Sequence, residues 1–198
     1  MRRLLGLVVL VLAVAGCHGK GGQRGPTTRV AGPGQHDRMW ASRAYQMNLY
    51  QIEAGRLASS RATADRVRNL ARMMVRDHGE MRDQIELHAR QHHLALPPDL
   101  NEVEGTYLRQ LSEVPAGPDF DRSYLNLELK THHEMIDLYE DEANKGEYPG
   151  ARAVAQENLP DLYAHQRHIE QLRPGTWTSP AKPTGDEKNP KEQPTTKK

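Results

Sequence analysis

Three histidines are spaced along the chain so that each falls within a separate amphipathic segment. His78, His132 and His165 each lie on the apolar stripe of their own segment, where helical periodicity directs side chains toward a core. Neutral imidazole binds zinc, copper and iron, and three imidazoles with a fourth open position form a recurring metal site. The three residues are therefore candidate metal ligands, provided that their helices bring the rings to one level.

Glu128 lies one turn before His132, so the two side chains share a helix face. Its carboxylate is suited either to bind the metal or to hold the tautomer of His132 by a hydrogen bond. The adjacent His133 is turned toward the flank, because neighbouring residues of a helix point about 100° apart. We predict a transition-metal site, with zinc, copper or iron as the candidate ion, that consists of His78, His132, His165 and Glu128.

The alternative to metal binding is a satisfied polar network in the core. An inward-facing histidine in a helical bundle is often bonded to a carboxylate or a carbonyl group. The chain is then a structural or interaction module without enzymatic activity, whose partners are other proteins or the wall of the cell envelope. The remaining histidines are expected at the surface or on the flanks of their helices: His36, His88, His92, His93, His133 and His168.

Composition argues against several classes of enzyme. The chain has one cysteine, which excludes an internal disulfide, a CxxC redox site and a CxxCH haem attachment. A serine or cysteine nucleophile motif and a glycine-rich phosphate loop are also missing. The formal net charge of +1 gives no support for nucleic-acid binding. We therefore favour a protein that is not an enzyme.

Helical periodicity occurs four times between residues 37 and 173. The first helix covers about residues 37–61, and the second follows Thr63, a candidate N-cap. The third is expected to end at Gly146, and the fourth to begin near Pro149. Asp119 or Asp121 is the candidate N-cap of the third helix. Pro160 is expected to kink the fourth helix or to restart it.

The depth of each histidine can be counted from the turns. His132 lies about 15 residues before the turn between the third and fourth helices, and His165 about 17 residues after it. At ~1.5 Å per residue these two rings, and the ring of His78, should lie at nearly the same level. The polar residues of the first helix, Gln51 and Glu53, are expected roughly 8–10 Å from that level. We therefore do not assign the first helix to the site.

Residues 94–118 form a long connection between the second and third helices, with a short amphipathic piece at 101–113. Alternating strand patterns and hairpin turns are missing. We predict an all-α fold, a ferritin-like four-helix bundle over residues 37–173 whose second and third helices are joined by this long connection. Disordered tails are expected to flank it, because residues 174–198 are rich in proline, lysine and threonine.

The N-terminal end has the pattern of an export signal. Two arginines precede an apolar run, residues 4–15, which is too short to span a membrane. The run closes on Val-Ala-Gly-Cys, which resembles a bacterial lipobox. Residues 1–16 are therefore predicted to be a lipoprotein signal peptide, and Cys17 the lipidated residue that anchors the chain to a membrane.

The residues after the cysteine predict where the anchor lies. Residues 17–36 are rich in glycine and are expected to form a flexible tether. His18 follows the cysteine at the position where a signal for inner-membrane retention usually has aspartate. In a Gram-negative cell we therefore expect the periplasmic face of the outer membrane.

Six stretches of the sequence together resemble one bacterial family, called domain of unknown function 4142 and described as ferritin-like outer-membrane proteins. The resemblance covers about residues 37–173 and implies a ferritin-like bundle exported to the envelope. The stretches are IEAGRLA (52–58), ARMMVRDHGEM (71–81), HHLALPPDL (92–100), FDRSY (120–124), KTHHEMIDLYEDEA (130–143) and LPDLYAHQRHI (159–169).

The same resemblance places His78, His132 and His165 at recurring histidines of the family. Gln51 stands where the family often has glutamate, an amide in place of a metal-binding carboxylate. No Glu-x-x-His motif occurs at the three histidines, so the di-iron chemistry of ferritin-like oxidases is not expected. The family has no settled activity.

Overall fold

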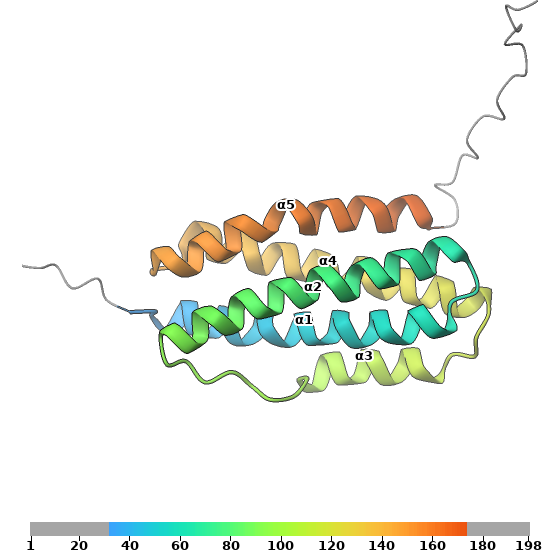
Figure 1. Ribbon diagram of the computed structural model, residues 1–198, viewed down its shortest axis with the longest axis horizontal. Coiled ribbons are helices and arrows are strands. Elements are labelled where there is room, and N and C mark those ends of the chain that lie inside the picture. Colours follow the sequence, from blue (N-terminus) through green and yellow to red (C-terminus); the bar gives the residue numbers. More distant parts are fainter. Residues whose placement is uncertain (1–31, 174–198) are drawn as a thin grey trace, which may run out of the picture. The chain divides into compact units, whose positions relative to one another are not determined.

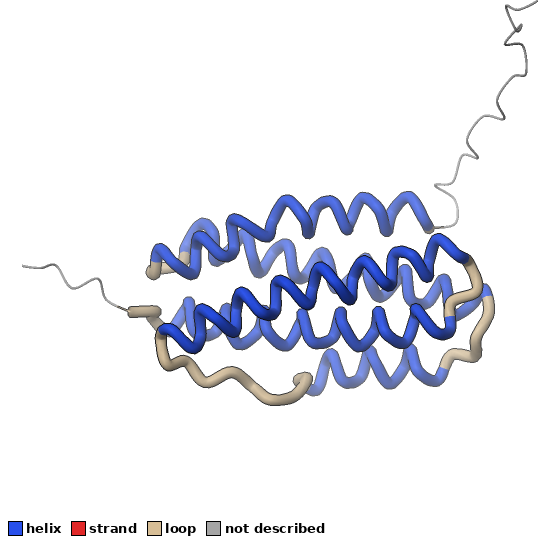
Figure 2. Tube along the Cα trace, viewed as in Figure 1, coloured by secondary structure: helices blue, strands red, loops and turns tan. Residues whose placement is uncertain are grey.

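The computed structural model describes residues 32–173, and its regular structure in this range is entirely helical (Figures 1 and 2). No strand occurs among the described residues, so the all-α prediction is confirmed, and none of their helices is both long and apolar enough to cross a membrane. The predicted signal peptide, Cys17, most of the predicted tether and the C-terminal tail lie outside the described residues. The helices are α1 (Gln35–Arg61), α2 (Asp65–Gln91), α3 (Glu102–Glu113), α4 (Pro118–Lys145) and α5 (Pro149–Leu172).

The four long helices form two antiparallel pairs, α1 with α2 and α4 with α5 (Figure 1). Asp121, at the start of α4, accepts hydrogen bonds from the backbone of Thr63 and Ala64, just before α2. The two helices therefore begin at the same end and run in the same direction. The connection between them returns along the domain, and its helix α3, the predicted amphipathic piece, packs against α1 and α4.

The core consists of two apolar clusters with a polar layer between them. Along α2, Met74 belongs to one cluster and Met81 to the other, and His78 lies between the two. The same order occurs on α4 and α5, where the buried histidine separates apolar residues of the two clusters: Leu125, His132 and Met135 on α4, and Leu162, His165 and Ile169 on α5. The candidate ligands therefore occupy one cross-section of the domain.

Two predictions about helix ends were wrong. Thr63 does not cap α2, whose N-cap residue is Ala64. Instead the carboxylate of Asp121 reaches across from α4 and accepts from the Thr63 amide, the Thr63 hydroxyl and the Ala64 amide, each at 2.9 Å. Asp121 therefore satisfies a neighbouring helix end, and α4 begins after Gly117. Of the two outcomes predicted for Pro160, a restart of the last helix does not occur, because α5 continues through this residue, and the kink stays a prediction.

Removing the cross-helix cap should destabilise the domain. Asp121→Ala leaves the Thr63 and Ala64 amides without their acceptor, and we expect a loss of about 1–3 kcal/mol in the free energy of unfolding. Urea denaturation followed by circular dichroism measures it. Asp119→Ala removes an exposed acid two residues away and should change stability by less than about 0.5 kcal/mol. Equal losses in the two variants would contradict the capping role of Asp121.

Candidate metal centre

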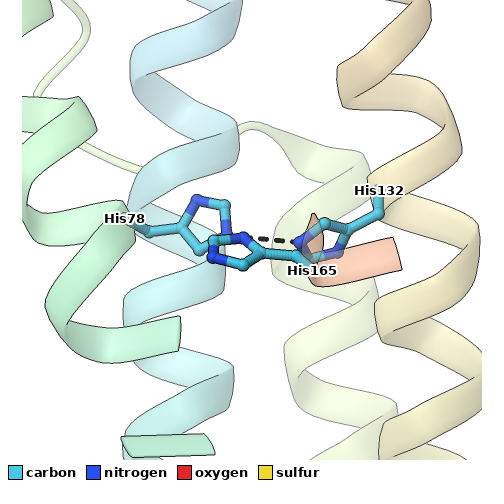
Figure 3. Close-up of side chains that lie close together, drawn as sticks. All are labelled: His78, His132 and His165. Atoms are coloured by element: carbon cyan, nitrogen blue, oxygen red, sulfur yellow. Dashed lines mark hydrogen bonds between the residues drawn. The ribbon is translucent and has the colours of Figure 1, made fainter. Parts of the chain in front are cut away.

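The imidazole rings of His78, His132 and His165 converge between α2, α4 and α5 (Figure 3). Their centroids lie 5.1–5.5 Å apart, and one nitrogen from each ring lies within 4.8 Å of the other two. His78 and His132 are fully buried, and His165 is 3% exposed. The predicted convergence of the rings is confirmed, whereas their role as metal ligands stays a prediction.

The tautomer of His78 is determined by Asn48 of α1. The amide nitrogen of Asn48 donates to the carbonyl oxygen of Ala44 at 2.8 Å and to the hydroxyl of Tyr139 at 2.9 Å. Its amide oxygen therefore faces His78, and lies 2.8 Å from Nδ1 of the ring. Because this oxygen only accepts, Nδ1 carries the hydrogen and Nε2 presents a lone pair.

His132 is held in the same tautomer by its own helix. Nδ1 of the ring lies 2.8 Å from the backbone carbonyl oxygen of Glu128, which again only accepts. Nδ1 therefore donates, and Nε2 is left with a lone pair. The carboxylate of Glu128 is 3.7 Å from Nδ1, the nitrogen that takes no part in the convergence with His78. Glu128 is thus beside His132 as predicted, but behind the ring.

In His165 the nitrogen that donates to a protein acceptor is Nε2, whereas in His78 and His132 it is Nδ1. Nε2 of His165 lies 3.1 Å from a carboxylate oxygen of Asp77, to which it donates. Nδ1 is buried and has no hydrogen-bond partner in the described residues. Each of the three rings therefore gives its hydrogen to a protein acceptor and keeps one free lone pair inside the domain.

The two Nε2 atoms of His78 and His132 are only 3.3 Å apart (dashed line in Figure 3). Both carry lone pairs, so no hydrogen lies between them. Burial, followed by the neighbouring His165, lowers the pKa of His132 to about 3, and burial lowers the pKa of His78 well below its ordinary value of 6.5. Two nitrogen ligands of a tetrahedral ion with bonds of ~2.1 Å are separated by about 3.4 Å. The arrangement therefore fits a cation.

The first helix lies closer to the centre than the sequence predicted. Gln51 is fully buried. With its amide nitrogen toward Glu128, it donates to the carboxylate at 2.6 Å, and its oxygen accepts from Thr131 at 2.8 Å. The expected separation of roughly 8–10 Å was too large, because Gln51 is one turn of about 5 Å from Asn48, which itself bonds to His78. Glu53, by contrast, is exposed and pairs with Arg56.

Asn48 was not among the predicted site residues, and His88 was predicted in the wrong place. Asn48 lies at the midpoint of α1, as His78 does in α2, and this polar residue on an apolar stripe was the available signal. His88, expected on a flank, is 5% exposed. Its ring lies 4.8 Å from that of His92 and 5.7 Å from that of Tyr148, measured between centroids. The turn before α5 covers it, which the periodicity of α2 alone does not show.

A family model described as "Domain of unknown function (DUF4142)" matches residues 23–172. The chain belongs to the DUF4142 family. The resemblance inferred from sequence motifs is thereby confirmed. A comparison with curated proteins gave no match.

Among solved structures, the DUF4142 domain is similar to a DUF305 fragment from Deinococcus radiodurans. The superposition has a TM-score of 0.64 and 13% sequence identity, and covers 72% of this chain and 97% of the other. At this identity the likeness extends to the fold alone.

The buried histidines should make the metal-free DUF4142 domain sensitive to acid. Their folded pKa values lie below the ordinary 6.5, so the stability they contribute is present above pH 6.5 and is lost as pH falls toward 3. His132→Leu should make the fall in unfolding free energy shallower by up to about 1.4 kcal/mol per pH unit. Urea denaturation of chelator-treated protein between pH 6.5 and 4 measures this slope.

The matched control is His133→Leu, which changes the exposed neighbour of His132. Its slope should equal that of the unmodified protein. If His132→Leu also leaves the slope unchanged, His132 is not held neutral in the folded state.

Proposed function

We propose that this DUF4142 protein is a ferritin-like four-helix bundle that binds one transition-metal ion at His78, His132 and His165. The bundle consists of α1, α2, α4 and α5, with α3 in the long connection. The observation that carries the proposal is the pair of facing Nε2 lone pairs, 3.3 Å apart. Zinc, copper and iron are the candidates, because imidazole nitrogen suits these ions whereas calcium and magnesium prefer oxygen.

The surrounding acids support a bound cation. Asp77 and Glu128 lie next to His165 and His132, on the sides of the rings that face away from the convergence. A divalent ion held by three neutral imidazoles would favour ionisation of both acids, including Glu128, whose pKa burial raises well above its ordinary value in the metal-free domain. Because its carboxyl group lies behind the ring of His132, Glu128 would orient this ring and offset the charge of the ion. The metal would supply Lewis acidity at this point, and we assign no reaction to it.

We further propose that the domain is tethered in the cell envelope by a lipid on Cys17. The lipobox-like end of the apolar run and the glycine-rich residues after it support this location. His18 favours the outer membrane, on its periplasmic face, in a Gram-negative cell. An interior site for a transition metal is compatible with an exported protein, because the ligands are imidazoles and no thiolate is needed.

A non-enzymatic structural module is the competing function. One observation favours it, namely that each of the three rings already has one protein hydrogen-bond partner, in Asn48, in the carbonyl of Glu128 and in Asp77. A core network offers such partners without any metal. The two functions differ in what metal addition does to the protein.

The full chain, purified without an affinity tag, should bind about one transition-metal ion and melt at a higher temperature when zinc, copper or iron is added. Elemental analysis and calorimetry measure both quantities. The double variant His78→Ala/His132→Ala should lose the ion and the thermal shift, whereas His133→Ala should keep them. Absence of metal together with an unmoved melting curve in the unmodified protein would reject metal binding and favour the structural module.

Asp77, which accepts from Nε2 of His165, should affect the affinity of the protein for the metal ion. Asp77→Ala removes the partner of Nε2, so that the ring can take the other tautomer and rotate. We expect metal binding to weaken by about 10–100-fold, measured by competition with a chromophoric chelator. Asp83→Ala removes an exposed acid of α2 that lies away from the three histidines in the sequence and should leave the affinity unchanged. An unchanged affinity in Asp77→Ala would show that Asp77 does not orient the ring.

A further inference from the structure

Two carboxyl groups are buried against each other at the end of the domain where α1 begins and α4 ends. Asp37 and Glu142 are both fully buried, and a proton on Glu142 would allow its carboxyl group to donate a hydrogen bond to that of Asp37. Asp37 accepts from three backbone amides, those of Gly34 at 2.6 Å, Glu147 at 2.9 Å and Tyr148 at 3.1 Å. Three such donors stabilise a negative charge, so Asp37 is the ionised member of the pair.

Glu142 has the opposite surroundings. Neither of its carboxylate oxygens accepts a hydrogen bond from a donor among the described residues. A buried carboxylate without donors is costly, and a proton removes the cost by making Glu142 a donor to Asp37. In agreement, burial and then the hydrogen bond to Asp37 raise the pKa of Glu142 to about 8. Burial would also raise the pKa of Asp37, but hydrogen bonds, that from the Tyr148 amide first, lower it.

We propose that Asp37 and Glu142 share one proton that latches the beginning of α1 to the end of α4 and the turn before α5, and that loss of this proton loosens this end of the domain. Asp37 is the centre of the latch, because its amide donors belong both to the start of α1 and to the α4–α5 turn. When Glu142 ionises, the two carboxylates repel, and Asp37 loses its side-chain donor.

The charged groups around Asp37 and Glu142 offset the negative charge of an ionised Glu142 only in part. On α1, Nε2 of His36 lies 3.3 Å from a carboxylate oxygen of Glu142 and 3.5 Å from one of Asp141. Asp141 itself pairs with Lys145 and adds negative charge beside Glu142. Arg152 on α5 donates to the carbonyl oxygen of Gly146 at 2.7 Å, and its charge acts to lower the pKa of Glu142. On α2, the charge of Asp37 acts on His88 in the direction that raises the pKa of that histidine.

The sign of the pH effect follows from Glu142. Its folded pKa, about 8, lies above its ordinary value of 4.5, so the folded state holds a proton that the unfolded chain has lost. The stability from the latch is therefore complete below pH 4.5 and is lost as pH rises to 8. The buried histidines act below pH 6.5 with the opposite sign. Glu128, whose pKa is also raised by burial, has the same sign as Glu142, so a variant is needed to separate them.

Hydrogen–deuterium exchange of the full chain tests the latch at the amides of Glu147 and Tyr148. Between pH 6.5 and 8.5, their protection factors, corrected for intrinsic rates, should fall by about tenfold or more in the unmodified protein. Glu142→Gln keeps a neutral donor to Asp37, and its protection factors should stay constant. Glu157→Gln, an exposed acid of α5, is the control and should behave like the unmodified protein.

Constant protection in the unmodified protein, or the same fall in Glu142→Gln, would overturn the proposal. A second measurement covers the case in which Glu142→Gln does not fold. The carboxyl carbon of Glu142, followed by NMR in the unmodified protein, should titrate with a midpoint near 8. A midpoint near 4.5 would mean that no proton is shared and would equally overturn it.

Discussion

Two unprotonated ring nitrogens that face each other at 3.3 Å are the constraint around which the interior of this protein is arranged. Such a contact is repulsive, and the net free energy of unfolding of a domain of this size is small. The contact persists because Asn48 and the carbonyl of Glu128 each hold a hydrogen on the far nitrogen of a ring. A cation at the convergence turns the repulsion into attraction. The metal site that we propose would make use of this polar layer.

The core can accommodate the polar layer of histidines because apolar packing closes it on both sides. Met74 and Tyr124 lie in the cluster on one side, and Met81 and Met135 in the cluster on the other. Water is thereby kept from the rings, which is why burial is the largest cause of the lowered histidine pKa values. The same exclusion of water strengthens any interaction between the lone pairs and a cation. In the metal site that we propose, the stability of the domain and its affinity for the ion would therefore depend on the same arrangement of helices.

The sequence predicted what depends on one helix at a time. The apolar stripes placed His78, His132 and His165 inside, and counting from the turns placed them at one level. It did not predict what depends on how two helices are rotated against each other. Asn48 behind His78, and Asp121 as the cap of α2, are such cases. Periodicity gives the inner face of each helix, but not which residue on that face meets which partner.

The two titratable groups of residues in this domain make opposite demands on the proton. The histidine layer has to exclude protons to keep its lone pairs, whereas the pair of Asp37 and Glu142 has to retain one. His132 and Glu142 are ten residues apart on α4, about 15 Å along the helix, so the two groups titrate at separate places in the domain. Since burial is the first cause of both pKa shifts, exclusion of water produces neutral imidazole in one place and neutral carboxylic acid in the other. Which form results depends on the group itself, because burial favours the neutral form: imidazole becomes neutral by losing a proton, and a carboxyl group by keeping one.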